Sequence, residues 1–163
     1  MNPGQLTITA RGDRELAMTR VFAAPRELVF EAWTRPELVV RWLGVHGGWS
    51  MDVCEIDLRV GGGYRFGWRG PGDARMGMRG VYREIVRPER LVSTEMFDGS
   101  AREAIATMVL VERDGRTTLT MTVRYESKEV RDAMLATRME QGLAAGFRRL
   151  DDVLISLEGS GGC

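Results

Sequence analysis

The sequence is poor in the residues on which many catalytic and metal sites depend. It contains one histidine, His46, and two cysteines, Cys54 and Cys163, and neither cysteine belongs to a C-x-x-C or Cys/His array. A structural zinc site or a histidine-activated nucleophile therefore lacks the groups it needs. We predict no catalytic residue, no metal site and no cofactor. Two cysteines also form no disulfide framework, so we expect free thiols and a cytoplasmic protein.

Net charge is absent as well. Lys and Arg together number 23, as do Asp and Glu, and Lys128 is the single lysine. A protein that binds nucleic acid needs a surplus of cations to displace counterions from phosphates, so we predict no nucleic-acid partner. The chain has no apolar run of about 18 residues and no basic-then-apolar start. We therefore expect neither membrane insertion nor a secretory signal.

The residues that are abundant indicate a globular core. Hydrophobic residues make up 44% of the 163, and they include ten methionines and four tryptophans. Methionine fills irregular apolar space, either in a core or on an adaptable binding surface. We predict one domain over residues 1–158 and a flexible Gly-rich tail over residues 159–163.

Hydrophobic periodicity predicts an α+β fold. Alternation in the first 22 residues indicates a hairpin that turns at Arg11-Gly12-Asp13. Two short helices follow; Pro25 opens the first, and Thr34-Arg35-Pro36-Glu37 fits a capping box that starts the second. A stretch of period two then predicts an antiparallel meander, because turn residues separate its strands at short intervals. These strands are expected at 49–59, 63–69, 75–86, 90–97, 104–113 and 116–125.

The last predicted element is a long helix. Ser127 can cap its N-terminus, and an apolar stripe continues from Met139 to Leu157. A helix of roughly 30 residues spans about 45 Å, so it must lie across the whole sheet. We therefore expect a curved antiparallel sheet wrapped around one C-terminal helix.

Four stretches of the chain resemble one known family. They are TRVFAAPRELVFEAWTRPELVVRWLG (19–44), CEIDLRVGGGYRF (54–66), GVYREIVRPERLVSTEMFDG (80–99) and RMEQGLAAGFRRLDDVL (138–154). In order and content they resemble the SRPBCC (START-like, birch-pollen-allergen-like) superfamily. Within it, they are similar to the bacterial branch related to the activator of the heat-shock-protein-90 ATPase.

The resemblance implies a helix-grip fold with a cavity between the sheet and the long helix. Members of the superfamily bind lipids, sterols, plant hormones or polyketides there, some cyclise or hydrate them, and the eukaryotic namesake contacts a chaperone. Many relatives carry a second Trp where this chain has Leu43, and often Gly-Pro where it has Gly44-Val45. The shape of the cavity entrance is therefore the least transferable property.

Two groups of side chains are candidates for the cavity wall. Tyr64, Phe66 and Trp68 share one strand face, opposite Arg65 and Arg69, and they either pack the core or line a pocket for a ligand. His46 lies among glycines and is expected to be a solvated loop residue.

Three charged residues are the second group. Strand alternation points Glu84 and Glu95 inward, together with Arg20, unless a bulge near Gly80 reverses Glu84. A buried carboxylate must be paired or have a raised pKa. An Arg20–Glu ion pair, a polar anchor for a ligand and a general acid or base are the three interpretations.

The leading hypothesis is non-catalytic binding of a small hydrophobic or amphipathic molecule under the C-terminal helix. The alternatives are a stress-linked interaction domain that acts on a chaperone, and a cyclase- or hydratase-type enzyme. A homodimer is compatible with the sequence, since symmetric dimers are common. The predicted ligand-binding residues are Trp42, Trp49, Tyr64, Phe66, Trp68, Met78, Tyr82, Glu84, Glu95, Met121, Met134 and Arg138.

Overall fold

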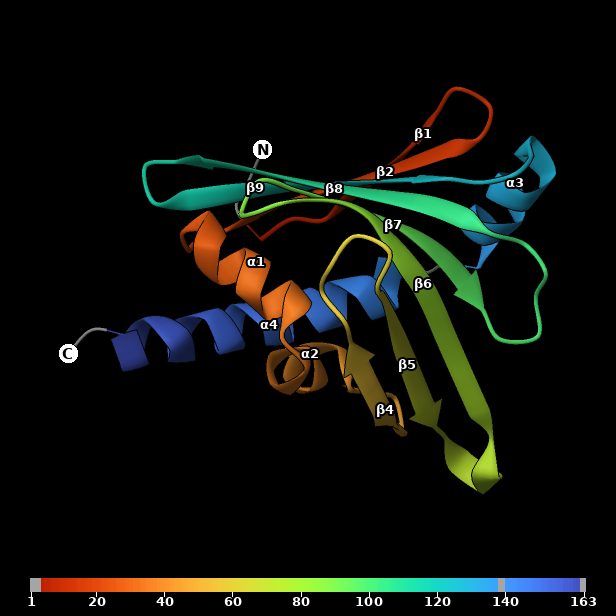
Figure 1. The fold of residues 1–163 in the computed structure, drawn as a ribbon, viewed down its shortest axis with the longest axis horizontal. Helices are drawn as coiled ribbons and strands as arrows, with labels where there is room; N and C mark the ends of the chain where they lie inside the picture. The colour runs from red at the N-terminus through yellow and green to blue at the C-terminus, as the bar shows by residue number, and fades with distance from the viewer. Residues whose placement is uncertain (1–3, 138–139, 162–163) are drawn as a thin grey trace.

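A computed structural model describes residues 4–137 and 140–161 as one curved antiparallel sheet with helices on its concave side (Figure 1). The strands lie in the order β1-β2-β9-β8-β7-β6-β5-β4-β3. Their bounds are β1 (Thr7–Arg11), β2 (Glu15–Phe22), β3 (Val45–His46), β4 (Trp49–Ile56), β5 (Gly63–Arg69), β6 (Arg75–Val86), β7 (Arg90–Phe97), β8 (Ala104–Arg113) and β9 (Arg116–Arg124). The helices are α1 (Arg26–Thr34), α2 (Pro36–Leu43), α3 (Lys128–Ala136) and α4 (Glu140–Gly161), with a short 3-10 turn η1 (Pro71–Asp73).

The predicted meander is confirmed, and the turn between β8 and β9 shows why the sequence encodes it so clearly. Asp114 and Gly115 form a two-residue loop between the paired residues Arg113 and Arg116. Both have positive φ, 54° and 76°. This backbone is that of a type I′ turn, whose twist matches that of the flanking strands and which favours Asp-Gly.

The sheet is sharply bent. In Figure 1, β9, β8 and β7 run along the top of the molecule, while β6, β5 and β4 turn away from them. Helix α4 lies in the angle between these two parts and packs chiefly against α2 and α1. The predicted helix-grip architecture is therefore confirmed.

An aromatic cluster holds the three helices together. The Trp42 ring lies 4.6 Å from the ring of Trp33 on α1 and 6.1 Å from that of Phe147 on α4, measured between centroids. The indole Nε1 of Trp42 donates a hydrogen bond to the carbonyl oxygen of Ala32 at 2.8 Å. This cluster fixes α4 to α1 and α2, and Phe147 also packs on Phe22 of β2, with 5.7 Å between ring centroids.

The predicted capping box at the start of α2 is wrong. Thr34 is the last residue of α1, and its hydroxyl donates to the carbonyl oxygen of Phe30 at 2.8 Å. Arg35 is the N-cap of α2, with an extended backbone and no capping side chain. Pro36 explains the difference, since proline forces the preceding residue out of helical geometry and itself starts a helix well.

The predicted single helix after Ser127 is two helices. Ser127 caps α3 as expected, because its hydroxyl accepts a hydrogen bond from the amide of Val130 at 3.2 Å. Helix α3 ends at Ala136, where the hydroxyl of Thr137 donates to the carbonyl oxygen of Met134 at 2.6 Å. Threonine competes in this way with helical hydrogen bonds, and α4 begins as a separate helix at Glu140.

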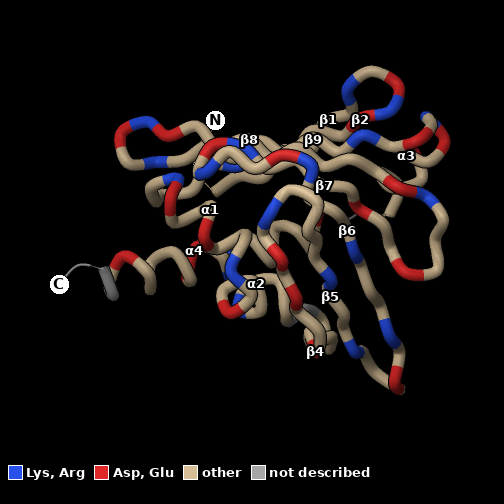
Figure 2. The backbone as a smooth tube through the Cα atoms, viewed as in Figure 1, with Lys and Arg blue, Asp and Glu red and all other residues tan. Residues whose placement is uncertain are grey.

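Charge is distributed evenly over the fold. Figure 2 shows basic and acidic residues interspersed along the strands and loops, without a continuous stripe of one sign. Among the described residues, no helix is long and apolar enough to cross a membrane.

Candidate functional site

The concave face of β5 carries the predicted aromatic row. Tyr64, Phe66 and Trp68 are at most 9% exposed. The rings of Tyr64 and Phe66 lie 4.9 Å apart, and the indole Nε1 of Trp68 donates to the carbonyl oxygen of Leu43 at 3.0 Å. The orientation predicted for these residues is therefore confirmed, and they form the floor of the concave face.

Apolar side chains beside this row are left uncovered. Met76 on β6 pairs with Trp68, and Met78 pairs both with Phe66 and with Phe97 on β7. Yet Met76 is 44% exposed and Phe97 is 37% exposed. The helices α1 and α2 thus cover one part of the concave face, while an apolar surface stays exposed at the start of β6 and the end of β7. Contiguous exposed apolar surface can mark an interaction site when it is extensive.

The predicted tryptophans and Tyr82 differ in their surroundings. Trp42 and Tyr82 are both 3% exposed and belong to the core. Trp49 at the start of β4 is half-buried and packs against the edge of that core, with Gly70 against its ring. Of these three residues, Trp49 is the one that retains an accessible surface.

A small pocket lies where the ends of β7, β8 and β9 meet α3. Its volume is about 100 Å³. It brings together two predicted ligand-binding residues, Glu95 and Met134, with the ring of Tyr125. Its full lining is Glu95, Phe97, Ser100, Arg102, Glu103, Ala104, Tyr125, Glu126, Val130 and Met134.

Glu95 lies on the concave face, as the alternation of β7 predicts. It pairs in register with Ala104 on β8, whose small side chain leaves room for the carboxyl group. Burial raises the pKa of Glu95 above its ordinary value, because the charged form loses hydration there. Among residues 4–137 and 140–161, no side chain forms an ion pair with this carboxyl group.

Two tyrosines adjoin Glu95. Burial raises the pKa of Tyr64 and of Tyr125, and the negative charge of Glu95 raises both further. The hydroxyl of Tyr64 donates to the carbonyl oxygen of Thr94 at 3.0 Å. Both phenols therefore stay protonated at neutral pH.

The predicted inward orientation of Glu84 is wrong. A register shift between Tyr82 and Glu84 inserts a β-bulge in β6, so Glu84 faces the convex side while Ile85 packs against the core. The carboxylate of Glu84 accepts a hydrogen bond from Arg90 Nε at 3.1 Å, and both side chains are well exposed. Glu84 therefore has no part in a concave-face site.

The predicted partner of Arg20 is also wrong. Arg20 points inward from β2 as expected, but it binds Asp151 on α4 rather than a glutamate. Asp151 is separated from it by 131 residues, and no local pattern of the sequence links the two. Arg20 thus anchors the C-terminal helix and is not available to a ligand.

Met121 and Arg138 complete the set of predicted residues. Met121 is half-buried and packs against both hydrophobic clusters of the concave face. Arg138 lies outside the described residues, and the side chain of His46 is likewise not described.

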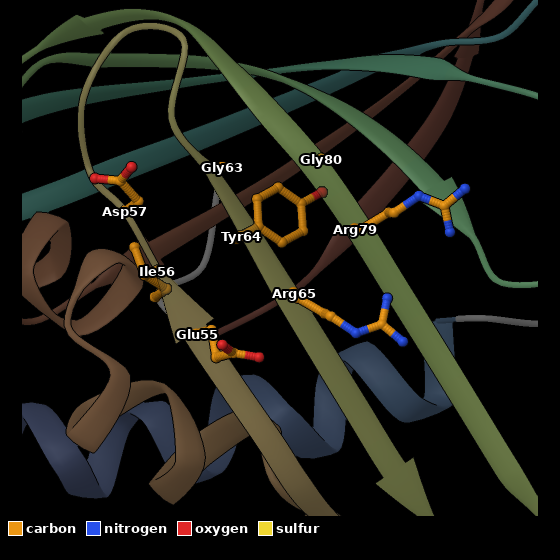
Figure 3. Close-up of a pocket in the computed structure, with 8 residues that line it drawn as sticks. All are labelled: Glu55, Ile56, Asp57, Gly63, Tyr64, Arg65, Arg79 and Gly80. Carbon is orange, nitrogen blue, oxygen red and sulfur yellow. The ribbon is translucent and has the colours of Figure 1, made fainter.

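A second, wider hollow lies on the convex face, with a volume of about 500 Å³. Figure 3 shows Arg65 on β5 and Arg79 on β6 extending side by side, near Glu55. Both arginines reach Asp98, at 3.5 Å and 3.2 Å. Their charges are therefore partly neutralised in a solvated setting, where ion pairs contribute little.

Cys54 is half-buried, and burial raises the pKa of its thiol. Within the described part of the chain, no three His, Cys, Asp or Glu side chains are grouped so that they could hold a metal ion.

Residues 23–154 match the family model described as "Activator of Hsp90 ATPase homolog 1-like protein". The chain belongs to this family. The activator-like family is part of the SRPBCC superfamily, so the resemblance seen in the sequence is confirmed. No curated protein matches the sequence.

Solved structures of several other proteins share the fold. A protein from Rhodobacter sphaeroides is 34% identical, with 93% of this chain and 99% of that chain covered and a TM-score of 0.87. A Mycobacterium smegmatis protein is 19% identical, with 92% and 97% covered and a TM-score of 0.81. An HSP90 activator from Plasmodium falciparum is 21% identical, with 68% and 72% covered and a TM-score of 0.52.

Proposed function

We propose that this protein binds a small hydrophobic or amphipathic molecule on its concave face, without catalysing a reaction on it. The uncovered apolar surface at Met76 and Phe97 is the observation that supports the proposal. Burying apolar surface in water is favourable by roughly 25 cal/mol per Å², and a ligand gains that free energy here.

The arrangement of the helices supports the same proposal. Helix α4 is held by α1, α2 and the Arg20–Asp151 pair, so the sheet beside β6 and β7 is not needed to hold it. The family to which the chain belongs is part of the SRPBCC superfamily, and members of that superfamily hold ligands between the sheet and the long helix.

The experiment compares the binding of the dye 1-anilinonaphthalene-8-sulfonate to variants of the two sheet faces. Met76→Gln and Phe97→Ser together should remove most of the increase in dye fluorescence. Val111→Gln is the matched control, because Val111 is 57% exposed and lies on the opposite face of β8 from the buried Leu110. Equal dye binding by the parent protein, the Met76→Gln/Phe97→Ser double variant and Val111→Gln would contradict the proposal. As a separate measurement, mass spectrometry of the denatured protein would show whether a natural ligand copurifies with it.

Action on a chaperone is the second candidate, and the name of the Plasmodium falciparum relative is what favours it. This role would be supported if the protein raised the ATPase rate of a purified bacterial chaperone of the HSP90 type. A rate that stays unchanged at saturating protein would exclude it for that chaperone.

A further inference from the structure

The pocket beneath α3 has apolar walls and one half-buried carboxyl group, that of Glu95. Phe97, Ala104, Val130 and Met134 contribute apolar surface, and Tyr125 contributes an aromatic ring that is 7% exposed. Glu95 is half-buried, and it lines the pocket. A carboxyl group in such a place strongly constrains which ligands fit beside it.

The charges around the pocket favour a cation. Among the residues that the structure describes, three carboxyl groups line it, those of Glu95, Glu103 and Glu126, and one cation, Arg102. Glu103 is already paired with Arg83 at 3.6 Å, and Glu126 accepts a hydrogen bond from the backbone amide of Glu103 at 3.3 Å. Glu95 is the carboxyl group that no hydrogen bond or ion pair among the described residues satisfies.

We propose that this pocket binds the ammonium group of an amphipathic amine, whose apolar chain lies on the concave face along Phe97 and Met78. This inference rests on the proposed function and specifies its ligand. The ammonium group donates hydrogen bonds to Glu95 and lies near the face of Tyr125, since aromatic rings attract cations. An anionic head group would instead meet three carboxyl groups.

The size of the pocket agrees with a head group and not with a whole amphiphile. A volume of about 100 Å³ accommodates a few non-hydrogen atoms. Phe97 belongs both to the pocket lining and to the uncovered apolar surface, where it pairs with Met78. The pocket therefore opens onto the surface on which the apolar chain would lie.

Three probes with the same chain test the head group. Octylamine, 1-octanol and octanoate are titrated into the protein by calorimetry at pH 7, where the amine is protonated. Octylamine is expected to bind about tenfold more tightly than octanol, the effect of one charge-assisted hydrogen bond, and octanoate is expected to bind most weakly. In Glu95→Gln, octylamine should bind no more tightly than octanol.

Glu84→Gln is the matched control, because it makes the same chemical change on the convex face. It should retain the preference for the amine. Equal affinities for all three probes, a preference for octanoate, or an amine preference that survives Glu95→Gln would overturn the inference while leaving the proposed function in place. If none of the probes binds and the dye does not either, both fail. The comparison of the three probes on the unchanged protein decides the question even if Glu95→Gln does not fold.

Discussion

Arg20 and Asp151 form a bidentate ion pair that joins β2 to α4. The guanidinium nitrogens Nη1 and Nη2 lie 2.6 Å and 2.7 Å from the two carboxylate oxygens of Asp151. The side chain of Arg20 is 3% exposed, whereas that of Asp151 is 36% exposed. The guanidinium group also lies over the ring of Phe22, at 4.6 Å from its centroid.

Because Arg20 is buried, replacing Asp151 alone should lower the free energy of unfolding more than replacing Arg20 and Asp151 together. Asp151→Asn leaves an uncompensated charge and is expected to lower the free energy of unfolding by about 3 kcal/mol. The double variant Arg20→Met/Asp151→Leu should recover much of this loss. Urea denaturation of the three proteins measures the effect, and a double variant less stable than Asp151→Asn would contradict the explanation.

Glu95 should make stability depend on pH. Its pKa is raised from an ordinary value of 4.5 by burial, so the folded state holds this proton more tightly than the unfolded state does. Stability from this group is therefore fully present below pH 4.5 and is lost as the pH rises through the folded pKa. Glu95→Gln should be more stable than the parent at pH 7 and lose that advantage near pH 4. Thermal unfolding across this range tests it; an advantage independent of pH would indicate another cause.

Two glycine substitutions should have opposite effects. A Cβ atom at Gly80 would collide with the carbonyl oxygen of Thr94 and lie 2.5 Å from the ring of Tyr64. Gly80→Ala is therefore expected to destabilise the protein by about 2 kcal/mol through overpacking. In α4, a Cβ atom at Gly146 would lie 3.6 Å from the carbonyl oxygen of Trp42, an ordinary contact. Gly146→Ala should stabilise the protein by up to about 1 kcal/mol. Chemical denaturation measures both, and a gain from Gly80→Ala would show that the backbone at Thr94 and the ring of Tyr64 both move aside easily.

Arg131 should hold α3, which forms one wall of the small pocket, against the first hairpin. Its side chain is buried, and Nη1 donates to the carbonyl oxygens of Gly12 and Glu15 at 3.1 Å and 3.0 Å, which fastens α3 to the first hairpin. Arg131→Gln is expected to speed amide hydrogen exchange in α3 by about tenfold while leaving β8 and β9 protected. Lys128→Gln is the control, since Lys128 forms no such contact among the described residues. Exchange that rises equally throughout the sheet would mean that Arg131 stabilises the whole fold.

The sequence predicted the strands well because their signals are local. Asp114-Gly115 marks a turn by the backbone angles it adopts, and alternation on β5 places Tyr64 and Phe66 on the buried face without knowledge of any partner. The same alternation failed at Glu84, where one extra residue in β6 reverses every later side chain. Such a bulge depends on how two strands pair, which β6 alone does not encode.

The candidate site was only partly predictable for a similar reason. Glu95 and Met134 could be placed near each other from the expected fold, and they do line one pocket. Tyr125 directly follows β9, and its proximity to Glu95 arises from the pairing of β7, β8 and β9. Asp151 could not be identified as the partner of Arg20, because the contact depends on where α4 crosses the sheet.

The packing of α4 mainly on other helices has a consequence for selectivity. Each strand is hydrogen-bonded to its neighbours along the sheet, whereas side-chain packing of Phe147, Leu150 and Leu154 and the Arg20–Asp151 ion pair hold α4. A longer apolar chain can therefore be accommodated by a small displacement of the helix, with no strand pairing broken. We expect the protein to discriminate sharply between head groups and weakly between chain lengths.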